Sequence, residues 1–548
     1  MRGSPTGLVR SDSNIAEGPT AGNLHAEDCE GAAGPHRQLL GLPGTWPVWA
    51  LAAFAAAALS SCVVSTTAPH SSKKNGQIES STGDLPETGL QGEVPLADQQ
   101  SGRSLEGYRK GMRLVGQNTI RDRGGNLQLA TFGHCAYVGT ASIPPAAHSL
   151  EGIAVLDVRR PENPRLVRII SSPAGSSSWE GLKASEQAGI LVSFVTSRTA
   201  PIATEVKSVP ESWKPGVNPS YADAFEVYEV SHECENPKRL ATINTRKVLT
   251  GGLHGLRLSP DGRTAYVSSM LAGLSEDDSQ TSLAAFDLSD PASPKLLAKW
   301  KWSDDSNETI DFGYHDGAVS NDGNTLFWGT IPMYSRRNPN DISRVMIQAF
   351  DVSSIQSRSR APGFNLLGAL HWQDCSREMA MAHGAQYAII RGKPYLIAGG
   401  ECVGIQLHVI DVSDPRQMRL VSTYNIEAND QQNAQIVTAD NATYWAHYFG
   451  VDSTSEATSL FVTWFGSGLR AIDIRDPTHL LEFAYLNPPA HPKSVFCLMM
   501  CATTYEVSTS DVKYDRATGN TWFVGANGGF YVAHLTESAG ANGLARQP

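Results

Sequence analysis

Apolar strands joined by acidic turns recur six times along the chain. The clearest copy runs from Leu407 to Pro415 as Leu-His-Val-Ile-Asp-Val-Ser-Asp-Pro, and a second apolar strand follows it. The first acidic residues of the six copies are Asp157, Glu229, Asp287, Asp351, Asp411 and Asp473. Successive copies are 72, 58, 64, 60 and 62 residues apart. A repeat of this length that carries several strands predicts a ring or solenoid of small sheets.

A hairpin pattern precedes the acidic turn within a repeat. Residues 253–268 and 314–328 each contain two strand-like runs, joined by Asp261-Gly262 and Asp322-Gly323 respectively. Asp-Gly between alternating strands is a strong hairpin signal. In the acidic turn, the Asp side chain is expected to accept hydrogen bonds from the backbone amides ahead of it. Hairpin and turn together supply four antiparallel strands, which predicts the blade of a β-propeller.

The last repeat is incomplete, and the missing strand occurs near the other end of the chain. Residues 507–514, 521–524 and 530–534 predict three strands, while residues 112–120 resemble the outgoing strands of the complete repeats. We therefore expect an all-β protein, most simply a propeller of seven four-stranded blades over residues 106–538, closed by this N-terminal strand. Closure would bury an otherwise unpaired sheet edge. Six and eight blades are the alternatives.

The repeated motif also resembles a known family. The run from Leu407 to Pro415 is similar to the LVIVD repeat, a propeller repeat of exported bacterial and archaeal proteins. Residues 464–477 and the closing segments 515–519 and 528–532 resemble the same family's last blades. The second and fourth copies depart from the motif, with Glu229 in place of Asp and no Asp-Pro after Val352. The resemblance implies a cell-surface or secreted propeller, and it supplies no catalytic residues.

The N-terminal region predicts export and lipid attachment. An apolar run of 14 residues, 46–59, is shorter than the roughly 20 residues that span a membrane, so it suits a secretory signal. Leu59-Ser-Ser-Cys62 resembles the lipobox of bacterial lipoproteins, in which the peptide is cut before an acylated cysteine. A plain secretory signal, or a signal anchor with an incidental Cys, is the alternative. Val63, rather than Asp, favours the outer membrane or cell surface over inner-membrane retention.

These features divide the chain into four parts. Residues 1–61 are interpreted as a leader with a signal peptide, and residues 62–105 as a disordered tether that follows the lipidated Cys62. The low apolar content of residues 62–105 cannot offset the entropy cost of folding. The propeller follows, and residues 539–548 form a flexible tail. The net charge of −11 comes without a basic stripe, which argues against a nucleic-acid partner.

Six cysteines remain besides Cys29 and Cys62, and an exported protein permits disulfides among them. Sequence cannot choose among the 15 pairings of six cysteines. The nearest pairs along the chain are Cys375 with Cys402 and Cys497 with Cys501, and buried free thiols are the alternative.

Four histidines occur at matching places in successive repeats. His254 and His315 each precede the hairpin glycine by 8 residues, His383 precedes Gly392 by 9, and His447 opens the next hairpin. The innermost strands of a propeller line its central channel, so these imidazoles are expected to meet at one mouth. Neutral imidazole suits iron, zinc and copper. Acidic residues at related positions are expected to accept hydrogen bonds from the imidazole N–H groups; they are Glu180, Asp316 and Asp511. Water-filled channel mouths also carry polar residues without a metal.

Two functions follow from these observations. The first is a membrane-anchored binding or scaffold module with an unidentified protein or small-molecule partner, favoured because nucleophile-elbow, zinc-protease, phosphate-loop and dinucleotide motifs are absent from the sequence. The alternative is a metal-dependent enzyme, for example an oxidoreductase, at the four-histidine mouth.

Overall fold

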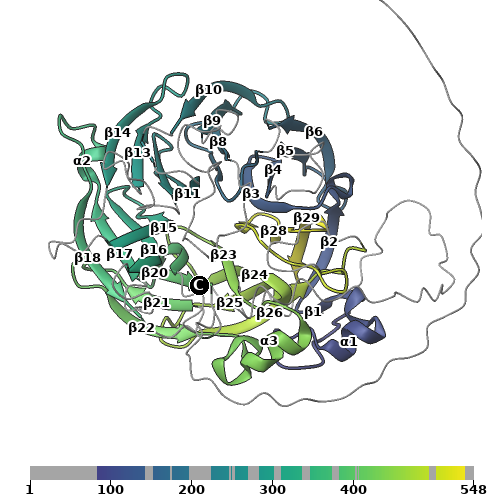
Figure 1. Ribbon diagram of the computed structural model, residues 1–548. Helices are drawn as coiled ribbons and strands as arrows, with labels where there is room; N and C mark the ends of the chain where they lie inside the picture. The colour runs from purple at the N-terminus through teal and green to yellow at the C-terminus, as the bar shows by residue number, and fades with distance from the viewer. Residues whose placement is uncertain are drawn as a thin grey trace, which may run out of the picture. The chain divides into compact units, whose positions relative to one another are not determined.

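Seven antiparallel sheets are arranged around a common centre in the computed structural model (Figure 1). The structure describes residues 83–141, 152–172, 176–196, 224–245, 248–249, 253–269, 283–300, 310–335, 346–372, 382–401, 404, 407–492 and 502–536. Six of the sheets have four strands and one has five. The prediction of a seven-bladed β-propeller is therefore confirmed.

Blades 1 to 4 each consist of four strands in chain order from the centre outward. Blade 1 contains β3 (Asn126–Phe132), β4 (Cys135–Thr140), β5 (Gly152–Asp157) and β6 (Arg165–Ser171). Blade 2 contains β7 (Leu182–Ser185), β8 (Ile190–Val195), β9 (Ala224–Glu229) and β10 (Lys238–Asn244). Blade 3 contains β11 (Leu253–Leu258), β12 (Thr264–Ser269), β13 (Leu283–Asp287) and β14 (Lys295–Trp300). Blade 4 contains β15 (Ile310–Val319), β16 (Thr325–Ser335), β17 (Met346–Asp351) and β18 (Asn365–His371).

Blades 5 to 7 continue the ring, and the last two recruit strands from the N-terminal side. Blade 5 contains β19 (Ala382–Ile390), β20 (Lys393–Gly400), β21 (Leu407–Asp411) and β22 (Arg419–Tyr424). Blade 6 contains β23 (Ala446–Val451), β24 (Ser459–Trp464), β25 (Gly468–Asp473) and β26 (Leu481–Asn487), with β1 (Tyr108–Lys110) as a fifth strand. Blade 7 contains β27 (Lys513–Asp515), β28 (Asn520–Gly525) and β29 (Gly529–Leu535), completed by β2 (Met112–Asn118).

The ring is closed by β2, as the sequence predicts. It pairs antiparallel with β29, from Met112 opposite Leu535 to Asn118 opposite Phe530. The preceding strand, β1, pairs with β26 of the neighbouring blade, with Tyr108 opposite Asn487. Figure 1 shows both strands beside the last blades of the chain. Consecutive N-terminal strands therefore fasten two adjacent blades, which was not expected from the sequence.

The acidic residues that end the third strands hold the turns that follow. One carboxylate oxygen of Asp411 accepts a hydrogen bond of 2.9 Å from the backbone N–H of Ser413. The carboxylates of Asp157, Asp287, Asp351 and Asp473 make the same bond two residues ahead. Glu229, the exception in the sequence, bonds the N–H of His232 three residues ahead with its longer side chain. The turn chemistry predicted from the motif is thus confirmed.

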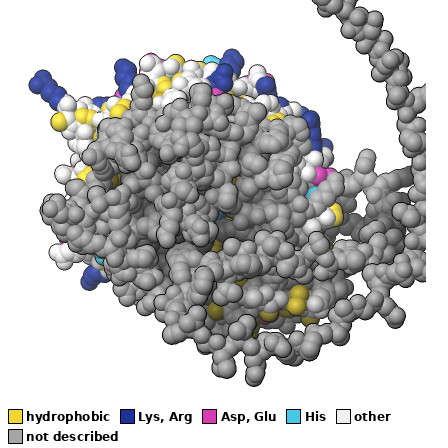
Figure 2. Space-filling view, in the orientation of Figure 1, with side chains coloured by type: hydrophobic (Ala, Val, Ile, Leu, Met, Phe, Trp, Pro, Cys, Tyr) yellow, Lys and Arg dark blue, Asp and Glu magenta, His cyan; other side chains and the backbone are white. Residues whose placement is uncertain are grey.

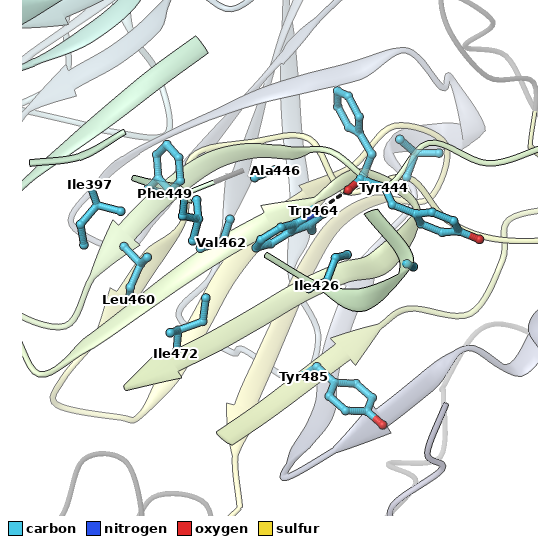
Figure 3. Packing of buried hydrophobic residues seen from close by; sticks show 14 of the residues in the cluster. Ile397, Ile426, Tyr444, Ala446, Phe449, Leu460, Val462, Trp464, Ile472 and Tyr485 are labelled. Atoms are coloured by element: carbon cyan, nitrogen blue, oxygen red, sulfur yellow. Dashed lines mark hydrogen bonds between the residues drawn. The ribbon is translucent and has the colours of Figure 1, made fainter. Parts of the chain in front are cut away.

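Side chains between neighbouring sheets form the hydrophobic core. In the cluster around blades 5 and 6, Ile397, Leu460 and Ile472 are fully buried, and Figure 3 shows them beside Trp464. The indole N–H of Trp464 donates a hydrogen bond of 2.6 Å to the backbone oxygen of Tyr444, drawn as a dashed line in Figure 3. Burying apolar surface supplies the main driving force for this packing. The polar indole group is satisfied at the same time.

Residues 83–105 do not behave as the loose tether that their composition predicts. Val94 is fully buried, and its N–H donates a hydrogen bond of 3.0 Å to the hydroxyl of Tyr444. Glu87 pairs with the buried guanidinium of Arg470, which also binds Glu482 at 2.7 Å. The tether prediction is therefore wrong for this segment, because a few specific contacts with blade 6 compensate for its low apolar content. Residues 62–82, with Cys62, lie outside the described residues, as does the predicted tail.

A disulfide joins blade 1 to blade 2. Cys135 begins β4 and Cys234 follows β9, with their Cα atoms 5.9 Å apart and a sequence separation of 99. The sequence did not predict this pairing. The cysteines of the two pairs that it favoured, Cys375 with Cys402 and Cys497 with Cys501, lie outside the described residues.

Helical segments are short and lie in the connections. The α-helices are α1 (Leu96–Ser101), α2 (Ser353–Gln356) and α3 (Ala434–Asp440). The 3₁₀-helices are η2 (Arg103–Glu106), η3 (Ile120–Asp122), η5 (Glu427–Asn429), η6 (Gln431–Asn433) and η7 (Phe465–Ser467). Among the described residues, none of the helices combines the length and apolar character needed to cross a membrane. On the face seen in Figure 2, the described Lys and Arg side chains are spaced along the rim.

Candidate metal centre

A shared irregularity of the innermost strands directs side chains toward the centre of the ring. In five blades the pairing of the first strand with the second shifts register over a three-residue step. The step starts at the first residue of the strand in blades 1, 3, 5 and 6, and at Tyr314 within the longer β15 in blade 4. Such irregularities of the β-bulge type re-aim side chains and are common beside functional sites. The residue that follows the start of each shift is His254, His315, His383, His447 or, in blade 1, Leu127.

The four predicted histidines meet. The Nε2 atoms of His254 and His315 are 2.7 Å apart. The ring centroids of neighbouring imidazoles are 4.0 Å apart for His254 and His315, 3.9 Å for His315 and His383, and 4.4 Å for His383 and His447. Since these residues come from four successive blades, they can only meet where the innermost strands face one another. The convergence expected from their spacing in the sequence is therefore observed.

Two carboxylates lie among the imidazole nitrogens. Glu180, from the segment before β7, has an oxygen 3.1 Å from Nε2 of His254 and 3.8 Å from Nε2 of His383. Its other oxygen is 3.5 Å from Nε2 of His447. Glu401 directly follows β20, and one of its oxygens lies 3.4 Å from Nε2 of His447 and 3.7 Å from Nε2 of His383. We call these four histidines and two glutamates the axial cluster.

The axial cluster is buried, and part of its hydrogen-bonding capacity is unused. Its six residues are between 0 % and 5 % exposed. Both ring nitrogens of His383 and Nδ1 of His315 have no hydrogen-bond partner. A buried polar atom without a partner costs about 1–3 kcal/mol. His447, in contrast, is oriented by a hydrogen bond between Nδ1 and the backbone oxygen of Thr509. Because a carbonyl oxygen only accepts, Nδ1 carries the proton and Nε2 can offer its lone pair.

The charges of the axial cluster are coupled. Burial, reinforced by neighbouring imidazoles, holds the pKa of His315 and of His383 well below the ordinary histidine value, so both rings are neutral. Burial alone would raise the pKa of Glu180, but its contacts with the surrounding imidazoles, His254 first among them, outweigh burial and hold the pKa well below its usual range. Burial opposes protonation of His447 as well, yet Glu180 and Glu401 raise the pKa of this imidazole. An ionised Glu180 carboxylate is therefore held among the imidazoles.

These donor atoms are of the kinds that bind a transition-metal ion, and they lie near the spacing that one ion requires. Metal–ligand bonds to imidazole nitrogen and carboxylate oxygen are about 2.0–2.2 Å, so neighbouring ligands lie about 3.0–3.4 Å apart in octahedral or tetrahedral geometry. The distances given above between nitrogen and oxygen atoms of the cluster run from 3.1 to 3.8 Å. In addition, each of three triads drawn from the cluster has its ligand atoms within 4.8 Å of one another. Two ionised glutamates would balance the charge of a divalent ion.

Two of the predicted outer residues have a different role from the one expected. Asp316 lies 3.0 Å from a guanidinium nitrogen of Arg257, and Asp511 pairs with Lys183 and, at 3.5 Å, with Arg257. Burial, partly offset by Arg257, raises the pKa of Asp316 to about 6. We call these four residues the ion-pair layer. The expectation that the two aspartates accept from imidazole N–H groups is therefore corrected, because cations on blades 2 and 3 engage their carboxylates.

The glutamates also differ from expectation. Glu180 was expected behind the histidines, whereas it lies within reach of all four rings. Glu401 was not selected as a candidate ligand, because it follows the second strand of its blade rather than lying on the first. The only indication of Glu401 in the sequence is its position, as a charged residue directly after the strand that ends in Gly399-Gly400.

Fold and site together define a β-propeller with imidazoles and carboxylates gathered at its centre. Residues 402–426 match the family model of the LVIVD repeat. No curated protein matches the sequence. Among solved structures, the Cps50 (Swd1) β-propeller domain of Myceliophteria thermophila is 11% identical, covering 75% of this chain and 97% of that chain at a TM-score of 0.42.

Two further solved structures have comparable similarity. A protein from Lactobacillus plantarum is 10% identical over 71% of this chain and 88% of its own, with a TM-score of 0.44. The periplasmic gluconolactonase PpgL of Pseudomonas aeruginosa is 12% identical over 66% of this chain and 96% of its own, with a TM-score of 0.35. Similarity at this level carries no argument about activity.

Proposed function

We propose that this chain is an exported, lipid-anchored β-propeller that binds one divalent transition-metal ion, of the iron, zinc or copper class, in its axial cluster, and that its activity depends on this ion. The observation that carries the proposal is the burial of four imidazoles and two carboxylates at ligand spacing, with Nε2 of His383 left without a hydrogen bond. Coordination would satisfy that nitrogen and neutralise the buried carboxylates, which are otherwise costly.

The geometry favours this metal-dependent function over a metal-free binding module. Among the described residues, no Lys or Arg lies within ion-pairing distance of Glu180, whose acidic oxygens face His254, His315, His383 and His447. A purely structural carboxylate at this depth would be expected to pair with a cationic side chain or with backbone amides. A binding or scaffold role toward a protein partner stays a prediction from the sequence.

Export and anchoring are supported by two observations. The disulfide between Cys135 and Cys234 is of the kind that persists in oxidising compartments. The run before Cys62 has the length and small-residue flank of a lipoprotein signal. We expect the full chain to fractionate with membranes and its Cys62→Ala variant to be released or to stay unprocessed. Wild-type protein found wholly in the soluble fraction would exclude the anchor.

The metal proposal is tested by elemental analysis of the purified full chain. We expect about one equivalent of iron, zinc or copper per chain. A His315→Ala plus His383→Ala variant should lose it, because each substitution removes a ligand nitrogen. The matched control is His232→Ala, which removes an exposed imidazole and should retain the ion. The proposal is contradicted if the wild-type protein contains no metal and takes up none on addition. It is also contradicted if the double variant retains its metal undiminished.

A further inference from the structure

Tyr448 lies between the axial cluster and the ion-pair layer. It directly follows His447 in β23, within the register shift between Ala446 and Phe449. Successive side chains of a regular strand point to opposite faces, so the shift is what allows both rings to approach the centre. The Tyr448 ring packs edge-on against His383 at 4.8 Å and His447 at 4.7 Å between centroids.

The other side of Tyr448 meets the cations of the ion-pair layer. Nζ of Lys183 lies 5.1 Å from the ring centroid, and the guanidinium carbon of Arg257 lies 5.8 Å from it. Its backbone N–H donates a hydrogen bond of 3.2 Å to the hydroxyl of Thr463, which in turn donates one of 2.8 Å to the backbone oxygen of Ser510. These ring contacts and the backbone hydrogen bond restrict the orientation of the phenol.

The phenol is directed toward Glu180. The Tyr448 hydroxyl donates a hydrogen bond of 2.8 Å to Oε2 of Glu180, and both residues are buried. A carboxylate side chain can rotate about its last bonds. The fixed donor holds Oε2, the oxygen that faces His254, His315 and His383, and so leaves the other oxygen directed at His447. Partners of this kind, which orient a ligand without touching the metal, commonly matter 10- to 100-fold for affinity.

We infer that Tyr448 is a positioning residue of the metal centre: its hydroxyl fixes the orientation in which Glu180 presents its two oxygens to the four imidazoles. This inference rests on the proposed function and adds a determinant of how the ion is held. Removing the hydroxyl releases Oε2, and the carboxylate can then rotate away from this orientation. Both the affinity and the ligand field of the ion should change.

The test uses Co²⁺ alone, added to the metal-free full chain. Tyr448→Phe keeps the ring packing and removes one oxygen, so we expect Co²⁺ affinity to fall about 10- to 100-fold. The visible Co²⁺ absorption, which reports coordination number, should also change in intensity. Tyr444→Phe is the matched control, because the Tyr444 hydroxyl donates to Asp440 at 2.7 Å, outside the axial cluster. It should leave affinity and spectrum unchanged.

A double-mutant cycle separates positioning from general packing. If Tyr448 acts through Glu180, then adding Tyr448→Phe to a Glu180→Gln background should produce no further loss of affinity. Additive losses would overturn the inference. If Tyr448→Phe does not fold, Thr463→Val is tested in its place, because it removes the hydroxyl that holds the backbone of Tyr448. This variant should give a smaller loss of Co²⁺ affinity with the same spectral change. An unchanged affinity would overturn the inference.

The outcomes distinguish this inference from the proposed function. Wild-type protein that binds no Co²⁺ and contains no other metal removes the proposed function itself. Wild-type protein that binds Co²⁺, together with a Tyr448→Phe variant of equal affinity and identical spectrum, overturns the positioning role alone.

Discussion

Glu180 and Glu506 are both buried carboxylates, yet they find entirely different partners. Glu506 accepts hydrogen bonds of 2.9, 3.1 and 2.6 Å from the backbone N–H groups of Val507, Asn527 and Gly528, and one of 2.9 Å from the hydroxyl of Tyr531. Glu180 accepts one hydrogen bond, from the hydroxyl of Tyr448, and its oxygens otherwise face imidazole nitrogens. Both side chains are buried, but their neighbours differ in chemistry.

The difference shows how a structural carboxylate is told from a candidate ligand. Burial, which outweighs the backbone hydrogen bonds, raises the pKa of Glu506. Around Glu180 the imidazoles reverse the effect of burial and lower the pKa. The oxygens of Glu506 already accept hydrogen bonds from the local backbone of blade 7 and are not available to an ion. The oxygens of Glu180 point at groups that bind metals, so only this glutamate is available to an ion.

The largest expected difference between the two glutamates is in metal affinity. Glu180→Gln removes a charged ligand and should weaken metal binding by more than about 100-fold, beyond the range typical of outer partners. Glu506→Gln should leave the affinity unchanged, because its side chain turns toward the amides of residues 507, 527 and 528. Competition with a coloured chelator measures both. Equal losses in the two variants would mean that Glu180 is no more a ligand than Glu506.

A smaller difference is expected in stability without metal. Glu506→Ala leaves three backbone donors without an acceptor, and water that enters the vacated space replaces the carboxylate only in part. The free energy of unfolding should therefore fall by about 2 kcal/mol. Glu506→Gln retains an acceptor oxygen and should cost less. Urea unfolding in the presence of chelator measures the change. An unchanged midpoint for Glu506→Ala would show that these amides do not depend on the carboxylate.

Much of the fold followed from local chemistry. The Asp of each acidic turn bonds an amide two residues ahead, and the Asp-Gly hairpins place Gly262 and Gly323 at φ angles of 70° and 76°, which other residues adopt with strain. Such signals lie within a few residues and can be read from one repeat. The closing strand was also found, because residues 112–118 repeat the pattern of other outer strands.

Other features depended on contacts between distant segments. The segment 83–105 has the composition of a tether, but Arg470, more than 360 residues away, offers a buried partner for Glu87. Cys135 pairs with a cysteine 99 residues further on, although closer cysteines seemed the simpler choice. Neither contact leaves a signal in the sequence around its members.

The sequence by itself determined the repeat, the blades and the set of histidines that share one register, because hydrogen bonding and side-chain alternation act over short stretches of chain. Only the tertiary structure decided which acidic residues join those histidines. Closing the ring brings Glu180 and Glu401 to the imidazoles and turns Asp316 and Asp511 toward Arg257. That choice is electrostatic, and it depends on distances between blades that no single repeat encodes.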